Sequence, residues 1–256
     1  MPVPYGNNKN IMKKRLETIL AHAGISSRRH AASIIKGGAV KVDGRVVTEK
    51  GLRFDPEENV ITVSGKALPA EEKKYYFLFN KPKNVISTVI DTHGRRKVTD
   101  YFVKEKNARL YPVGRLDKDT TGVLLVTNDG ELAMRLMHPR YVIDKEYTAT
   151  VEKRLTEEDA TKIKNGITLG DGKTSPCELN FVSKNPEGVI YRLKLHEGRK
   201  RQIRRMFYAV GVKVLELNRN KYAGFTAGNL KEGEYRKLSE SEVQRLRELT
   251  GAKNTV

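Results

Sequence analysis

The chain contains no tryptophan and a single cysteine, and aromatic residues make up only 7% of its 256 residues. The single cysteine, Cys177, cannot form a disulfide within the chain, and no group of His and Cys residues has the spacing of a metal site. No apolar run is long enough to span a bilayer, and no hydrophobic segment of the secretory type opens the chain. These absences argue against a disulfide-rich scaffold and a membrane-spanning protein. They favour a cytoplasmic location with no metal or cofactor.

Acidic residues are scarce relative to basic ones. Asp and Glu total 31 against 49 Lys and Arg, which gives a formal net charge of +18. An excess spread over most of the chain predicts a polyanionic partner, most simply nucleic acid, with a membrane surface as the competing interpretation. Because aromatic residues are few, RNA binding would depend more on charge than on base stacking.

The first part of the chain predicts two short helices that carry basic residues. Apolar residues recur at helical spacing between Lys13 and Ala23, and a cap at Ser26 or Ser27 predicts a second helix that ends at Gly37 and Gly38. Phosphates bind well at a helix N-terminus, where backbone amides point outward. We therefore predict RNA contacts here, although an ordinary solvated basic face would show the same pattern. The predicted contact residues are Arg15, Arg28, Arg29 and Lys36.

A small sheet is expected after these helices. Residues 39–47 alternate around a tight-turn signal at Asp43-Gly44, and residues 59–63 form a further short strand. We assign residues 12–65 to one small domain, residues 1–11 to a disordered leader and residues 66–74 to an interdomain linker.

This block resembles the S4-type RNA-binding domain, named after the fourth protein of the small ribosomal subunit. The similarity implies binding of structured RNA and no catalysis. Its motifs are Arg15-Leu16-Glu17, Ala23-Gly24-Ile25-Ser26-Ser27-Arg28-Arg29 and the run from Ile34 to Gly44.

Residues 75–250 predict a larger domain of mixed strands and helices. The pattern indicates an α+β fold with a mixed or antiparallel sheet. A basic loop over residues 91–97, with Arg95 and Arg96, is predicted to clamp RNA. Strands are expected at residues 75–80, 85–89, 123–127, 145–151, 189–195 and 214–217. Helices are expected at residues 130–137, after Thr156, at 196–207 with five cations in residues 199–205, and after a capping box at Ser239.

The loop from Gly114 to Gly122 carries two carboxylates, Asp117 and Asp119, into the buried strand at residues 123–127. A rigid strand can hold a catalytic group that the preceding loop presents, but a polar turn before a strand would look the same. The two carboxylates are weak evidence for a glycosidase, because residues two apart in a loop can face apart. No Ser-His-Asp arrangement or phosphate-binding glycine motif stands out. The residues alone do not specify the reaction.

The same loop closely resembles the signature of the RsuA/RluB family of ribosomal RNA pseudouridine synthases. The resemblance spans nearly the whole chain and is nearest to the RluB branch, which acts on the large subunit. Its motifs are residues 114–130, Asn80-Lys81-Pro82, Lys145-Glu146-Tyr147 and Glu197 to Met206.

This resemblance implies that Asp117 is the catalytic aspartate in the isomerisation of uridine to pseudouridine. Asp117 would either attack the sugar or take a proton from it, and an ionised carboxylate is needed in both cases. Arg204 is the candidate cation that keeps Asp117 ionised, and Tyr147 would stack on the flipped base. Asp119 is assigned no catalytic role.

The resemblance also predicts the partner, ribosomal RNA or an assembly intermediate, bound by a monomer. The alternatives are a small-subunit enzyme of the same family, a non-catalytic RNA-binding assembly protein and, more remotely, a nucleoside glycosidase. Predicted RNA contacts in the larger domain are Arg95, Arg96, Arg115, Lys145, Arg199, Lys200, Arg201 and Arg205.

Overall fold

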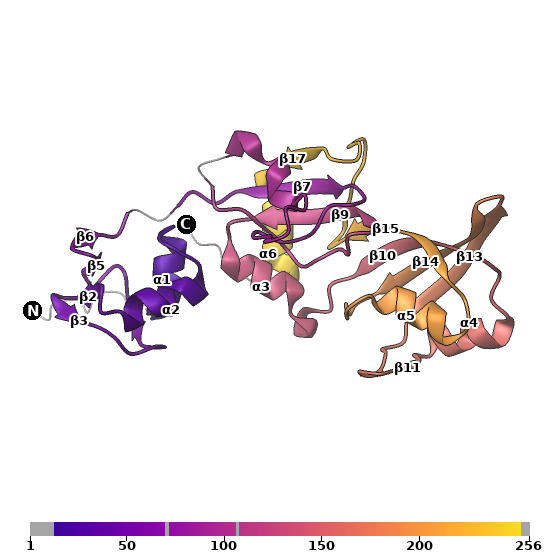
Figure 1. The fold of residues 1–256 in the computed structure, drawn as a ribbon, viewed down its shortest axis with the longest axis horizontal. Helices are drawn as coiled ribbons and strands as arrows, with labels where there is room; N and C mark the ends of the chain where they lie inside the picture. The colour runs from indigo at the N-terminus through magenta and orange to yellow at the C-terminus, as the bar shows by residue number, and fades with distance from the viewer. Residues whose placement is uncertain (1–12, 70–71, 106–107, 252–256) are drawn as a thin grey trace, which may run out of the picture. The chain divides into compact units, whose positions relative to one another are not determined.

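The computed structural model describes residues 13–69, 72–105 and 108–251. It divides into two compact units, Met1–Lys73 and Lys74–Val256, which Figure 1 shows in indigo and in the remaining colours. The predicted leader, residues 1–11, lies outside the described residues.

The first unit packs two helices against a small antiparallel sheet. The Ser27 hydroxyl caps the second helix by accepting a hydrogen bond from the His30 amide at 3.1 Å. The side chains of Leu16, Leu20 and Ile35 are fully buried and form the core with strand residues. The helices are α1 (Leu16–His22) and α2 (Arg28–Lys36); the strands are β1 (Lys14–Arg15), β2 (Val40–Val42), β3 (Arg45–Val46), β4 (Arg53–Phe54), β5 (Ile61–Val63) and β6 (Lys66–Ala67).

The sheet of this unit extends further along the chain than the sequence predicted. Its strand order is β3-β2-β5-β6, and β6 pairs with β5 through Thr62 and Ala67. A linker that begins at residue 66 therefore begins too early, because residues 66–67 are an edge strand of the first unit. The structure divides the two units between Lys73 and Lys74.

One mixed sheet forms the frame of the second unit, in the order β13-β14-β10-β15-β9-β7-β17. Its neighbouring strands are antiparallel except β15 and β9, which run parallel over three residue pairs at the centre. The strands of the mixed sheet are β7 (Tyr76–Lys81), β8 (Tyr111–Pro112), β9 (Thr120–Thr127), β10 (Lys145–Val151), β13 (Glu178–Asn185), β14 (Gly188–Leu195), β15 (Val214–Tyr222), β16 (Phe225–Thr226) and β17 (Tyr235–Lys237), whereas β11 (Thr168–Leu169) and β12 (Gly172–Lys173) form a separate two-stranded sheet.

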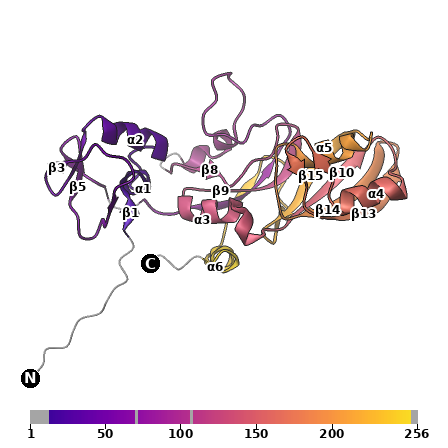
Figure 2. The same cartoon turned by 90° about the horizontal axis from the view of Figure 1, so that it is seen from below.

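Strand β9 is buried along all eight residues. Leu124 and Val126 belong to one apolar cluster, while Val123 and Leu125 belong to a second cluster on the opposite face. A strand that is covered on both faces has a continuous run of apolar residues in its sequence, which is why the sequence could predict a buried strand here. Helices α3 (Gly130–Met137) and α6 (Glu240–Leu249) lie on the same side of β9 (Figure 2).

Helices α4 (Glu157–Lys164) and α5 (Gln202–Ala209) cover the other half of the sheet, near β10, β13 and β14 (Figure 1). Ile163 of α4 and Met206 and Phe207 of α5 are buried in the larger cluster. Short 3₁₀ turns complete the second unit at η1 (Val98–Tyr101), η2 (Val103–Glu105) and η3 (Pro139–Tyr141).

Three local predictions for this unit differ from the structure. Helix α5 begins at Gln202, because Arg201 adopts a left-handed conformation with φ 50°. The predicted helix over residues 196–207 therefore starts too early. Residues 85–89 form no strand and contribute only a single bridge, from Ile86 to Lys97. The sequence places the apolar residues Val243, Leu246 and Leu249 of α6 at a spacing that predicts burial on one face, but Leu249 is 50% exposed whereas Leu246 is buried.

Within the described residues, none of the helices has the length and apolar character that crossing a membrane requires.

Candidate active site

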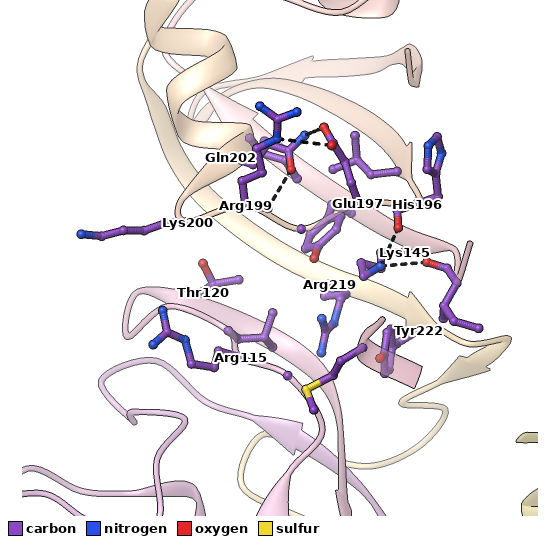
Figure 3. Close-up of a pocket in the computed structure, with 18 of the residues that line it drawn as sticks. Arg115, Thr120, Lys145, His196, Glu197, Arg199, Lys200, Gln202, Arg219 and Tyr222 are labelled. Carbon is purple, nitrogen blue, oxygen red and sulfur yellow. Dashed lines mark hydrogen bonds and ion pairs between the residues drawn. The ribbon is translucent and has the colours of Figure 1, made fainter. Parts of the chain in front are cut away.

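A cleft of about 690 Å³ opens in the second unit, beside the place where β9 and β15 run parallel. It is lined by the loop before β9, the start of β10, the turn before α5 and the middle of β15 (Figure 3). Asp117, Tyr147 and Arg219 all line it. The structure thus brings together the predicted catalytic aspartate and tyrosine, and it adds an arginine that the sequence did not single out.

A row of paired residues crosses the sheet at this cleft. Tyr147 on β10 pairs with Arg219 on β15, which pairs with Gly122 on β9, which pairs with Lys81 on β7. Directly paired residues share one face of a sheet, so Tyr147 and Arg219 stand side by side. Gly122 has φ +104°, and a Cβ atom there would lie 2.3 Å from the Arg219 carbonyl oxygen. Glycine is therefore needed for β9 to approach β15 this closely.

Lys81, whose side chain is fully buried, holds the Asp117 loop in place through hydrogen bonds. The Lys81 Nζ donates to the Thr120 carbonyl at 2.8 Å and to the Pro82 carbonyl at 2.9 Å. The Thr120 amide in turn donates to the Asp117 carbonyl at 3.1 Å. Burial lowers the pKa of Lys81 to about 8, although the charges of Asp119 and Asp117 act to raise it. The sequence motif Asn80-Lys81-Pro82 thus has a structural role in the site.

The two carboxylates of this loop are used differently. Asp117 is half-buried at the cleft, and its carboxylate makes no hydrogen bond or ion pair within the described part of the chain. The Asp119 carboxylate accepts hydrogen bonds from both terminal nitrogens of Arg201, at 3.0 and 3.2 Å, and forms an ion pair with Nη2 of Arg204 at 3.1 Å. Partial burial acts to raise the pKa of Asp119, but the hydrogen bond from Arg201 and the charges of Arg204 and Arg201 outweigh it, and the net pKa is lowered.

This arrangement differs from the predicted partnership of Arg204 with Asp117. Arg204 also donates to the Asp119 carbonyl at 3.1 Å and to the Val214 carbonyl at 2.9 Å, so it joins the loop, α5 and β15. Asp117 lies close enough for its charge to raise the pKa of Arg204 and Arg201, even though burial and other groups lower the net pKa of Arg204. Arg204 therefore contributes positive potential near Asp117 without binding it.

Glu197 organises the turn before α5. Its carboxylate accepts the Ser175 amide at 3.0 Å, the Gln202 side-chain amide at 2.5 Å and the Arg199 Nε at 3.3 Å. Arg199 also donates to the carbonyls of residues 171–173, and Arg205 forms a bidentate pair with Asp171. These contacts hold the far wall of the cleft in place (Figure 3). The sequence motif contains Glu197, but only the folded chain shows what it contacts.

Lys145 lies at the start of β10 and is half-buried. Its Nζ donates to the carbonyls of Ile143 at 2.8 Å and His196 at 3.0 Å, which joins two walls of the cleft. Burial and the nearby Arg219 charge lower the pKa of Lys145 to about 8. The amine that was predicted to contact RNA therefore has a structural role within the chain.

The predicted RNA-binding cations fall into two groups. Arg199, Arg205 and Lys145 are half-buried and hold oxygen atoms of the chain itself. Arg95 is exposed but is paired with Asp91 at 2.6 Å, and Arg96 stacks on the Tyr101 ring at 4.3 Å. Exposed side chains are found at Arg15, Arg28, Arg29, Lys36, Arg95, Arg96, Arg115, Lys200 and Arg201.

Arg219 is the functional candidate that sequence reasoning missed. A weak signal was present, because Arg219 lies two residues after the apolar Leu217 in an alternating strand and so shares its inward face. The described residues contain no group of three or more His, Cys, Asp or Glu side chains that could hold a metal ion.

Comparison with known proteins gives a separate family match for each of the two units. The RNA pseudouridylate synthase family model matches residues 75–209, and the S4 domain model matches residues 14–60. The chain belongs to the RNA pseudouridylate synthase family. It is 47% identical to ribosomal large subunit pseudouridine synthase B of Bacillus subtilis, over 92% of this chain and 96% of the relative. An uncharacterized RNA pseudouridine synthase of Aquifex aeolicus is 36% identical over 95% and 97% of the two chains.

A solved structure supports the same family assignment. The crystal structure of a pseudouridylate synthase aligns with a TM-score of 0.64 at 30% identity, over 91% of this chain and 99% of the other. The expected α+β class, with an S4 domain before a mixed-sheet synthase domain, is confirmed. As a family member, the chain is an isomerase that acts on RNA uridine.

Proposed function

We propose that this chain isomerises a uridine of large-subunit ribosomal RNA to pseudouridine, with Asp117 as the catalytic carboxylate. The observation that carries the proposal is the Asp117 carboxylate, which lines the same cleft as Tyr147 and has no partner of its own within the described residues. The relative that is 47% identical over nearly its full length is a large-subunit enzyme, which favours that RNA over the small-subunit alternative.

The cleft has the properties that this reaction requires. A target base must leave its stack to reach a site on the protein, and the cleft is large enough for one nucleoside. Arg201, Arg204 and Lys81 place positive charge around the loop that carries Asp117. Asp117 then attacks the anomeric carbon or takes a proton from the sugar, and Tyr147 stacks on the base.

RNA is held by charge over both units. In the first unit Arg15, Arg28, Arg29 and Lys36 are exposed, as phosphate contacts must be. Near the cleft, Arg115 and Lys200 are exposed and make no ion pair within the described residues. We place the reaction in the cytoplasm, on free ribosomal RNA or an assembly intermediate, with the protein acting as a monomer.

Pseudouridine mapping of ribosomal RNA from a strain that lacks this chain tests the proposal. One site should disappear from the large-subunit RNA, return with the wild-type chain and stay absent with Asp117→Asn. Asp144→Asn is a matched control, because Asp144 is an exposed carboxylate paired with Lys194 outside the cleft.

The Asp117→Asn variant should bind RNA with near-normal affinity, since one carboxylate contributes little to an interface driven by many cations. If this variant still converts uridine at the normal rate, the site assignment is wrong. Loss of a small-subunit site would instead favour the small-subunit enzyme, and intact modification with defective assembly would favour a non-catalytic assembly protein.

A further inference from the structure

Arg219 is buried at the cleft with a hydrogen-bond donor to spare. Only 3% of its surface is exposed, its Nε donates to the Val123 carbonyl at 2.8 Å, and its guanidinium lies 4.5 Å from the centre of the Tyr222 ring. Its Nη2 is buried and has no hydrogen-bond partner among the residues that the structure describes. Leaving a buried charged donor unpaired is costly, so the site is built for an acceptor that the chain itself does not supply.

A second buried polar atom lines the same cleft. The Thr120 side-chain oxygen also has no hydrogen-bond partner within the described residues, and Thr120 is the first residue of the stretch that pairs with β15, opposite Leu217. Figure 3 shows Thr120 and Arg219 around the same cavity. A guanidinium can only donate, whereas a hydroxyl can donate or accept. The two groups together suit a ligand that presents an acceptor next to a further polar atom.

The position of Arg219 is tightly determined. Tyr147 is its direct neighbour across the sheet, and Gly122 lies on its other side where a Cβ would overlap the Arg219 backbone. A base stacked on Tyr147 would therefore have its edge close to the Arg219 guanidinium. The carboxylate of Glu197 is occupied by Ser175, Gln202 and Arg199 and does not compete for it.

The chemistry of the proposed function, on which this inference rests, identifies the acceptor. The bond from sugar C1′ to uracil N1 breaks, its electron pair leaves with N1, and the negative charge spreads onto the carbonyl oxygens O2 and O4. A new bond joins C1′ to C5, the C5 proton is lost to solvent, and N1 gains a proton. Exchanging N1 for C5 requires a half-turn of the base about the line through N3 and C6. The same half-turn exchanges O2 and O4.

We propose that Arg219 is a catalytic residue that donates from Nη2 to a uracil carbonyl oxygen and retains the detached base while it turns. Because the turn exchanges O2 and O4, the donor that held one carbonyl meets the other in the product. A preorganised cation in a desolvated site also stabilises the charge that develops on those oxygens. The Thr120 hydroxyl provides a second contact to the edge of the same base.

A doubly labelled RNA separates turnover from loss of the base. Ribosomal RNA from the deletion strain is labelled with uracil carrying tritium at C5 and carbon-14 at C2. Tritium release to water measures isomerisation, and soluble carbon-14 uracil measures escape of the detached base. Wild type should release tritium and almost no free uracil. Arg219→Met should lower tritium release by roughly 10²- to 10³-fold, as loss of a charge-stabilising donor does, and should raise the ratio of free uracil to pseudouridine.

Thr120→Val gives a second test that does not depend on the fold of the Arg219 variant. Since the hydroxyl has no internal partner, a methyl group in its place should leave the melting temperature unchanged or higher. The ratio of free uracil to pseudouridine should nevertheless rise. Arg236→Met is the matched control, because Arg236 on β17 pairs with Glu242 on α6 and does not line the cleft.

The outcomes distinguish this inference from the proposed function. If wild type releases no tritium from any ribosomal RNA, the proposed function fails and the inference fails with it. If wild type is active but both Arg219→Met and Thr120→Val keep the wild-type ratio of free uracil to pseudouridine, only the inference is overturned. A fall in tritium release with Arg219→Met at an unchanged ratio of free uracil to pseudouridine would also overturn the inference, because Arg219 would then act through another group, such as Asp117, and would not hold the base.

Discussion

The fully buried Lys81 allows a quantitative test of how the catalytic loop is held. Its amine donates to the carbonyl oxygens of Pro82 and Thr120, and burial lowers its pKa to about 8. The change we consider is Lys81→Met, which keeps the length and apolar stem of the side chain and removes the titrating group.

The size and sign of the expected stability difference between wild type and Lys81→Met follow from the lowered pKa of Lys81. Lowering it from 10.5 to about 8 corresponds to about 3 kcal/mol, at 1.36 kcal/mol for each pH unit. Between these two pH values the unfolded chain keeps the Lys81 proton while the folded chain loses it. Stability therefore rises with pH in this window because the unfolded state binds more protons. Wild type should gain stability relative to Lys81→Met above pH 8, and the difference should be flat below it.

Urea unfolding of both proteins at intervals from pH 7 to pH 10 measures this difference. Lys145, Tyr76 and Tyr222 also have shifted pKa values, but they are present in both proteins and cancel. We expect wild type to gain about 2 to 3 kcal/mol over the variant by pH 10. Lys83→Met is the control: Lys83 is exposed, Glu216 raises its pKa by hydrogen bonding, and its curve should stay parallel to wild type below pH 10. Parallel curves for wild type and Lys81→Met would refute the reasoning.

Two further predictions follow from the fold. Gly122→Ala should lower the unfolding free energy by about 2 kcal/mol or more and abolish tritium release, because φ is +104° and the added Cβ would overlap the Arg219 carbonyl; unchanged urea unfolding would contradict it. A fragment of residues 74–256 should keep the melting temperature and far-ultraviolet spectrum of the larger unit but bind RNA more weakly and with a smaller salt dependence, since it lacks the S4 cations. Loss of the folded spectrum would place the boundary elsewhere.

Elements whose signals are local were predicted well from the sequence. Helix α3 has the predicted bounds, with Asp129 capping the Leu132 amide, and β10 spans the predicted residues. The capping box of α6 is present, since Ser239 and Glu242 exchange hydrogen bonds. In each case a cap or an alternation of a few residues determines the element, and no distant contact is needed.

Elements that depend on distant contacts were predicted poorly. The start of α5 is set by the left-handed Arg201 and by hydrogen bonds that Glu197 makes to Ser175 and Gln202. Strand β13, Glu178–Asn185, was not predicted, because its mostly exposed residues show no apolar face before β14 pairs with it. Local sequence does not contain this information.

The same distinction explains why the residues alone could not show which of the two loop carboxylates is the catalytic candidate. The choice of Asp117 needed the family resemblance. Asp117 and Asp119 are two positions apart and chemically identical. In the folded chain Asp119 lies toward α5, where Arg201 and Arg204 bind it, whereas Asp117 lines the cleft without such a partner. The ion pairs that Asp119 forms with Arg201 and Arg204 join the loop to α5. Asp117 has no such partner among the described residues and stays available to a substrate.

The cations before and within α5 have a comparable double use. Residues 199–205 carry five of them, which as a sequence resembles a phosphate-binding run. The folded chain commits Arg199, Arg201, Arg204 and Arg205 to its own carboxylates and carbonyls, and leaves Lys200 exposed. The net charge of +18 therefore overstates the number of free phosphate contacts in the catalytic unit. Long-range attraction of RNA still uses every charge, so these arginines can draw in the substrate while their hydrogen bonds hold the walls of the cleft.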